Sequence, residues 1–155
     1  MTTLNKLLNT QLQNQYATTT GINMHKVLQS INIPTKNTEK YPDIANKIKS
    51  DPTLIQMFGP DYQTEVPIAG TINNKFISRR IDRLCINHNT QEITILDYKT
   101  DTNKQTFYTK HIKQINEYAE LLHKLYPDYK IRGYILWTHD FSLENIPIKS
   151  IIPAC

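Results

Sequence analysis

The stretch that decides the fold reads Ile95-Leu96-Asp97-Tyr98-Lys99-Thr100, an apolar strand that ends in a carboxylate and an ammonium two positions apart. Side chains two apart on a strand point to the same face, roughly 7 Å from each other along it. Charged side chains are rarely buried unless they are paired. The placement of Asp97 and Lys99 therefore indicates a site that binds a metal ion beside a phosphate.

A second acid is expected directly across from Asp97. The polar break from His88 to Gln91 is typical of a hairpin turn. If that loop is centred on Asn89 and Thr90, Asp82 pairs with Asp97, and two apolar pairs, Leu84 with Ile95 and Ile86 with Ile93, support the register. Opposed carboxylates repel each other at the roughly 5 Å spacing of a strand pair, and a divalent cation would reverse the sign of that interaction.

Glu65 is the third candidate acid. The preceding strand, about 65 to 72, is followed by Asn73-Asn74, and Asn tolerates the positive φ of a tight turn. A two-residue loop there places Glu65 opposite Asp82, whereas a three-residue loop that includes Lys75 turns Glu65 away. Glu65 is therefore a secondary catalytic candidate, with a charge at the strand edge as the alternative.

The order of elements predicts an α/β fold with a mixed central sheet, β-β-β-α-β, flanked by helices. The strands are expected at about 65 to 72, 76 to 87, 92 to 99 and 130 to 138, with an edge strand in the tail from 145 to 152. The helix from about 106 to 126 has Ile112, Ile115, Ala119, Leu122 and Tyr126 on one face. Gln114 and Tyr118 lie four apart on the shoulder of that stripe. Residues 1 to 20 are expected to form an N-terminal arm or linker remnant, and residues 21 to 155 one domain.

Asp82 followed by Asp97-Tyr98-Lys99 resembles the core of the PD-(D/E)XK nucleases, with a restriction-endonuclease-like fold. More specifically, the chain is similar to the C-terminal nuclease domain of the AddA and RecB helicase-nuclease subunits. Three further segments match that domain in order. They are the Gly21 to His25 opening, the Gln114-x-x-x-Tyr118 pair, and the late strand Gly133 to Thr138. The chain departs from the family where Ser78-Arg79-Arg80 replaces a frequent glycine, and it has no room for a helicase motor.

The resemblance implies a role for each matched residue. Asp82 and Asp97 would bind Mg²⁺ or Mn²⁺, ions that prefer oxygen ligands. His25 would join them through the resemblance alone, and Tyr98, between the second acid and the lysine, is counted with the metal site. Lys99 would assist the attacking water. Among the remaining candidates the resemblance assigns DNA contacts to Gln114 and Tyr118, while positive charge alone nominates Arg80, Arg83 and Lys110 for the phosphate backbone.

Composition narrows the class of protein. The chain has 155 residues, enough for one domain, a net charge of +4 and a pI near 9.0, which suits a polyanionic partner such as DNA. Its four scattered glycines form no phosphate loop, so no ATP site is expected. Two cysteines cannot build an iron-sulfur cluster. The sequence lacks an apolar run long enough for a signal peptide or a membrane span, so a cytoplasmic protein is expected.

The leading hypothesis is a metal-dependent DNA nuclease that cleaves single-stranded or unwound DNA and works with a helicase-nuclease partner in double-strand-break repair and recombination. Two alternatives stay open. One is a non-catalytic DNA-binding or assembly module, or a fragment detached from its helicase. The other is an unrelated α/β protein in which the charged strand ends are a coincidence.

Overall fold

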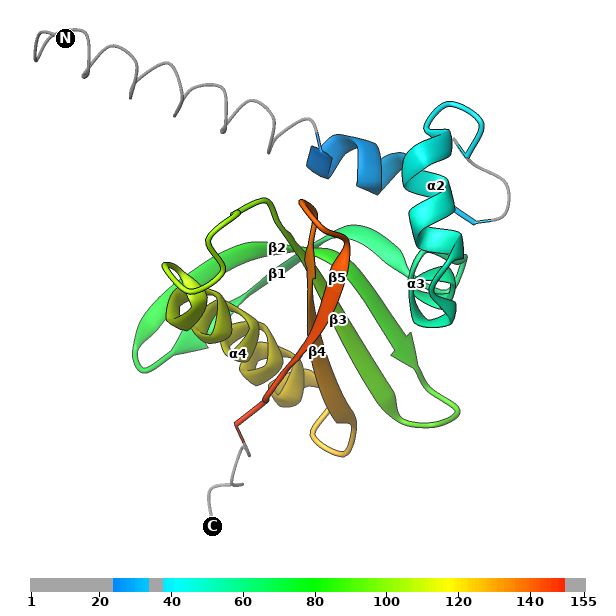
Figure 1. Ribbon diagram of the computed structural model, residues 1–155. Helices are drawn as coiled ribbons and strands as arrows, with labels where there is room; N and C mark the ends of the chain where they lie inside the picture. Colours follow the sequence, from blue (N-terminus) through cyan, green and yellow to red (C-terminus); the bar gives the residue numbers. More distant parts are fainter. Residues whose placement is uncertain (1–23, 34–37, 150–155) are drawn as a thin grey trace, which may run out of the picture.

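The computed structural model describes residues 24–33 and 38–149 as a mixed α/β protein built on one five-stranded sheet (Figure 1). The strands are ordered β1-β2-β3-β4-β5 across the sheet, with β3 and β4 parallel and every other neighbour antiparallel. Residues 24–30 are helical. The remaining elements are α2 (Pro42–Lys49), α3 (Pro52–Met57), β1 (Gln63–Ile72), β2 (Lys75–Asn87), β3 (Glu92–Lys99), α4 (Tyr108–Leu125), β4 (Lys130–Trp137) and β5 (Ser142–Ile146).

The α/β fold with its mixed sheet is confirmed, and so are both hairpin registers. Leu84 pairs with Ile95 and Ile86 with Ile93. In the first hairpin, Ile72 pairs with Lys75 across a two-residue turn in which Asn73 and Asn74 both have positive φ. That backbone conformation matches the twist of a hairpin and suits Asn better than most residues.

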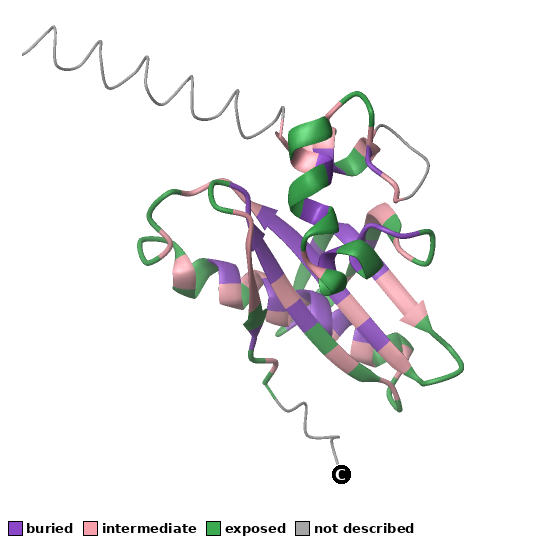
Figure 2. Cartoon of the chain, turned by 45° about the vertical axis from the view of Figure 1, so that its right-hand side comes forward, coloured by how far each residue is buried: buried purple, intermediate pink, exposed green. Residues whose placement is uncertain are grey.

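Two helical layers cover the two faces of the sheet (Figures 1 and 2). On one face, α4 packs over the hairpin of β1 and β2 and over Ile93 and Ile95 of β3. On the other face, the 24–30 helix, α2 and α3 pack against Leu96, Tyr98 and Leu136. Alternation along β3 therefore sends Asp97 to the face of α4 and Tyr98 to the opposite face.

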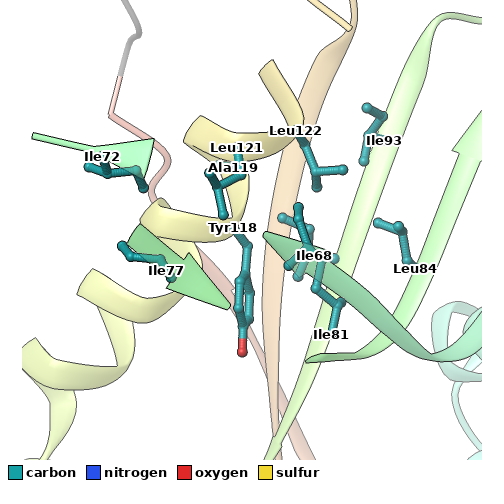
Figure 3. Packing of buried hydrophobic residues seen from close by; sticks show 11 residues of the cluster. Ile68, Ile72, Ile77, Ile81, Leu84, Ile93, Tyr118, Ala119, Leu121 and Leu122 are labelled. Carbon is teal, nitrogen blue, oxygen red and sulfur yellow. The ribbon is translucent and has the colours of Figure 1, made fainter. Parts of the chain in front are cut away.

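The core under α4 is formed by aliphatic side chains and one tyrosine. Leu121 and Leu122 pack against Ile68, Ile77 and the other buried residues of the hairpin, and Tyr118 reaches from α4 into the same cluster (Figure 3). The predicted apolar face of this helix was right at Ile115, Ala119 and Leu122. It missed Tyr118 and Leu121, which are both buried.

A kink at Glu65 changes which side chains of the hairpin face α4. Glu65 has φ of 53°, in the left-handed region that side chains rarely adopt. Strand pairing continues in the same register on both sides of it, from Thr64 with Arg83 to Val66 with Ile81. Ile81 and Leu84 nevertheless belong to the same cluster although they are three residues apart. Simple alternation would put residues three apart on opposite faces of the strand. The alternation is therefore interrupted between Ile81 and Leu84, at the level of Asp82, which lies across from the kinked residue Glu65.

Several boundaries differ from the sequence prediction by one to three residues. The tail strand is earlier than expected, because β5 ends at Ile146, before Pro147, whose missing N–H ends the pairing. The predicted N-terminal arm from 1 to 20 and the end of the predicted tail strand lie outside the described residues. None of the helices formed by residues 24–33 and 38–149 is both long and apolar enough to span a bilayer.

Candidate functional site

Asp82 and Asp97 meet on the α4 side of the sheet and are both buried, with relative exposures of 9% and 3%. The backbone N–H of Tyr98 donates to Asp82 Oδ2 at 2.8 Å, which fixes that carboxylate against the strand of Asp97. Burial raises the pKa of Asp82 well above its ordinary value, and the nearby charge of Asp97 raises it further. Asp82 therefore favours its protonated form more than an exposed aspartate does.

Lys99 supplies one positive charge next to this pair. Its Nζ lies 2.8 Å from Asp97 Oδ2, and the lysine side chain is 17% exposed. The approach to that oxygen is not aligned for a hydrogen bond, so Asp97 Oδ2 is buried and paired by charge alone. Asp82, Asp97 and Lys99 thus converge on one side of the sheet, as the sequence predicted.

A chain of hydrogen bonds holds Lys99 in place. Its Nζ donates to Gln114 Oε1 at 2.9 Å, and Gln114 Nε2 donates to the hydroxyl of Tyr118 at 3.0 Å. That hydroxyl donates in turn to the backbone carbonyl of Arg80 at 3.2 Å. The chain ties β3 to α4 and α4 back to β2, so the ammonium of Lys99 is anchored on two rigid elements.

His25 reaches the acid pair from the opposite layer. Its Nδ1 lies 3.8 Å from Asp82 Oδ1. Burial lowers the pKa of this histidine, while the charges of Asp97 and Glu65 and a hydrogen bond with the backbone of Tyr98 raise it. Glu65 therefore lies within electrostatic range of His25, on the kinked residue across from Asp82. Of the five groups, Asp82, Asp97, Lys99 and His25 are linked by ion-pair contacts, and Glu65 is linked to them only by its charge on His25.

Tyr98 lies in the metal-site region only through its backbone. Its ring points to the other face of the sheet, is 1% exposed, and lies edge-on to His25 with ring centroids 5.6 Å apart. Burial raises the pKa of its phenol. Only the backbone carbonyl of Tyr98 remains as a possible oxygen ligand.

Burial argues against two of the predicted DNA contacts. The side chain of Arg83 is 0% exposed, because it points under the 24–30 helix rather than toward solvent. Tyr118 is 1% exposed, and its hydroxyl is engaged by Gln114 and Arg80, so it anchors the site from within the core. Burial also raises the pKa of its phenol. Arg80 and Lys110 are exposed, as a phosphate contact requires.

The donor set fits a divalent cation in part. Two carboxylates and a carbonyl are the hard oxygen ligands that Mg²⁺ and Mn²⁺ prefer. The buried Asp97 Oδ2, which lacks a hydrogen-bond donor, is the kind of atom that such an ion would satisfy. In the described part of the chain, no group of three or more His, Cys, Asp and Glu side chains has the spacing of a preformed metal site.

Sequence reasoning missed a histidine-aspartate pair at the edge of the site. His111 Nε2 lies 2.7 Å from Asp101 Oδ2, and the histidine is 9% exposed. A signal was present, because Asp101 follows Lys99 by two positions and His111 precedes Gln114 by one helical turn. The pair therefore stands beside the Lys99–Gln114 contact.

Fold and site together define an α/β protein with a buried carboxylate pair and an adjacent lysine. No protein-family model and no curated protein matches the sequence. The solved structure described as "Crystal structure of SSO0001" is similar over 74% of this chain, with 16% identity and a TM-score of 0.39. The chain spans 61% of the length of that structure. A likeness of this size does not define a shared fold.

Proposed function

We propose that this protein is a metal-dependent DNA nuclease of the RecB type, which hydrolyses phosphodiester bonds in single-stranded or unwound DNA. One observation carries the proposal: the buried Asp97 Oδ2 has no hydrogen-bond donor, faces Lys99 at 2.8 Å, and lies beside a second buried carboxylate. Two carboxylates buried side by side are costly for stability, which supports a role in binding a cation.

Asp82, Asp97 and the backbone carbonyl of Tyr98 are the groups that would hold Mg²⁺ or Mn²⁺, with His25 closing the site. Such an ion, when bound, supplies a Lewis acid and lowers the pKa of a bound water. The remaining steps belong to the chain itself. Lys99 has one N–H directed to Gln114 and its charge directed to Asp97, so its ammonium can hold the attacking water or a non-bridging phosphate oxygen.

The substrate class follows from charge and exposure. Arg80 and Lys110 are exposed on β2 and in the first turn of α4, the two elements that are tied to Lys99. Positive side chains there would neutralise phosphates on either side of the scissile bond. The resemblance to AddA and RecB further suggests a helicase partner in double-strand-break processing, because this chain has no phosphate loop of its own.

The proposal is tested by incubating the purified protein with linear single- and double-stranded DNA, with Mg²⁺, with Mn²⁺ and with chelator. We expect cleavage only with metal, and at least a hundredfold loss in Asp97→Asn. Asp128→Asn is the matched control, because Asp128 is an exposed acid in the loop after α4. DNA binding without cleavage under every metal condition would instead favour the non-catalytic DNA-binding module.

A further inference from the structure

Arg83 occupies an unusual environment for a cation. Its side chain is 0% exposed. Within the described ranges it forms no salt bridge. Its partners are instead neutral oxygens and a ring: Nε donates to the Tyr98 hydroxyl at 2.6 Å, and the guanidinium lies 4.1 Å from the centre of the Phe58 ring. A buried guanidinium is expensive to desolvate. A complete set of hydrogen-bond partners for Arg83 therefore indicates a role beyond filling space.

The backbone partners of Arg83 lie where the 24–30 helix ends. Nη2 donates to the carbonyls of Leu28 at 2.9 Å and Ile31 at 2.6 Å. Nη1 lies 3.4 Å from the carbonyl of Met57, the last residue of α3. The final carbonyls of a helix have no partner inside the helix, and a cation there is favoured by the helix dipole. Arg83 therefore caps the helix that carries His25.

Adjacent residues of β2 thus act on opposite sides of the sheet. Asp82 faces α4 and meets His25 Nδ1 at 3.8 Å, and Arg83, on the opposite face, grips Leu28, one helical turn after His25. Tyr98 links the two: its backbone N–H binds Asp82, its hydroxyl accepts from Arg83, and its ring contacts the imidazole of His25. Together these three contacts fix the position of His25 relative to Asp82 and Asp97.

We propose that Arg83 is a positioning residue that holds the 24–30 helix so that His25 can complete a divalent cation site with Asp82 and Asp97, an inference that rests on the function proposed above. The partners of Arg83 are all protein groups. Arg83 acts through His25. Strand β2 thus supplies Asp82 to the site and, through Arg83, also holds the helix that carries His25.

The test is a double-mutant cycle with Mn²⁺ as the probe, measured by isothermal titration calorimetry. Lysine at position 83 keeps the charge but loses the planar fork. We expect Arg83→Lys to weaken Mn²⁺ binding about tenfold, as loss of an outer-shell partner does. In a His25→Ala background the same change should cost less than about twofold, because a residue that acts through His25 has nothing left to position. Equal losses in both backgrounds would overturn the proposal.

Tyr98→Phe is a second variant in case Arg83→Lys does not fold. It removes only the acceptor of Arg83 Nε and should act in the same direction, again only when His25 is present. Arg132→Lys is the matched control, because Arg132 is half-exposed on β4 and pairs with Glu92 instead of a helix end. It should leave Mn²⁺ affinity unchanged.

A metal-free readout separates this inference from the proposed function. In Arg83→Lys we expect faster amide hydrogen exchange in residues 26–31 and loss of the nuclear Overhauser contact between the rings of His25 and Tyr98. If the wild-type protein binds no Mn²⁺, the nuclease proposal fails, and the inference fails with it as far as it concerns the metal. Unchanged exchange and an unchanged ring contact in Arg83→Lys would refute the positioning role itself, whether or not the wild type cleaves DNA.

Discussion

The backbone amide of Tyr98 donates a 2.8 Å hydrogen bond to the carboxylate of Asp82. The strand that supplies Asp97 and Lys99 therefore also fixes the second acid, so the distance between the two carboxylates is set by main-chain geometry and not by flexible side chains. Holding the two carboxylates together in a buried site makes the stability of the folded protein depend on the protonation of Asp82.

The metal-free protein should lose stability as the pH rises. Burial and the charge of Asp97 raise the pKa of Asp82 from 3.8 to about 8. The folded state therefore prefers the protonated acid, and that contribution is complete below the ordinary pKa and is lost as the pH passes through the raised one. We expect the melting temperature in chelator to fall between about pH 4 and about pH 8, the interval between the two pKa values, and Asp82→Asn to flatten the curve. Parallel curves for the two proteins would contradict the assignment.

Gln114 and Tyr118 should separate into a catalytic effect and a stability effect. Gln114→Ala removes the acceptor that holds Lys99 Nζ, so cleavage should slow by about tenfold or more while the fold is kept. Tyr118→Phe leaves the ring in the core but removes the hydroxyl that bonds Arg80, at a cost of about 1 kcal/mol in the free energy of unfolding. Single-turnover cleavage and urea denaturation measure the two effects. If the Tyr118→Phe variant kept its full stability but bound DNA much more weakly, the hydroxyl of Tyr118 would contact DNA directly, against what its burial indicates.

Gly133 should tolerate a methyl group less well than Gly70. A Cβ at Gly133 would lie 2.5 Å from Ile115 Cγ2 and 3.1 Å from Ile148 Cδ1, whereas one at Gly70 would meet the terminal Leu121 Cδ2 at 2.6 Å. The γ-methyl of a β-branched residue is stiff, and the end of a leucine can move aside. We expect Gly133→Ala to cost about 1–3 kcal/mol and Gly70→Ala clearly less, by urea denaturation of both variants.

Arg80 should contribute to DNA affinity without affecting the fold. Its side chain is exposed on β2, so Arg80→Ala should weaken binding to DNA of any sequence and reduce the slope of log affinity against log salt by about 1. Fluorescence anisotropy over a salt series measures that slope, and circular dichroism checks the fold. An unchanged slope would remove Arg80 from the DNA surface.

Local chemistry was enough to predict the strands and their registers. The Asn73-Asn74 turn and the His88 to Gln91 loop specify how neighbouring segments pair, and alternation along β3 then places Asp97 and Lys99 on one face. These features depend on residues close together in the sequence, so the convergence of Asp82, Asp97 and Lys99 was accessible without coordinates.

Only the tertiary structure determined which of the other charged and aromatic candidates are buried and which are exposed. Arg83 and Arg80 look alike in the sequence, yet one caps a helix from 52 residues away at Ile31 and the other is exposed. The difference is one of cover: the 24–30 helix and the end of α3 lie over Arg83, whereas the side chain of Arg80 is exposed. Whether a side chain is buried depends on which distant element covers it, and that is settled by packing between layers and not by the pattern of any one strand.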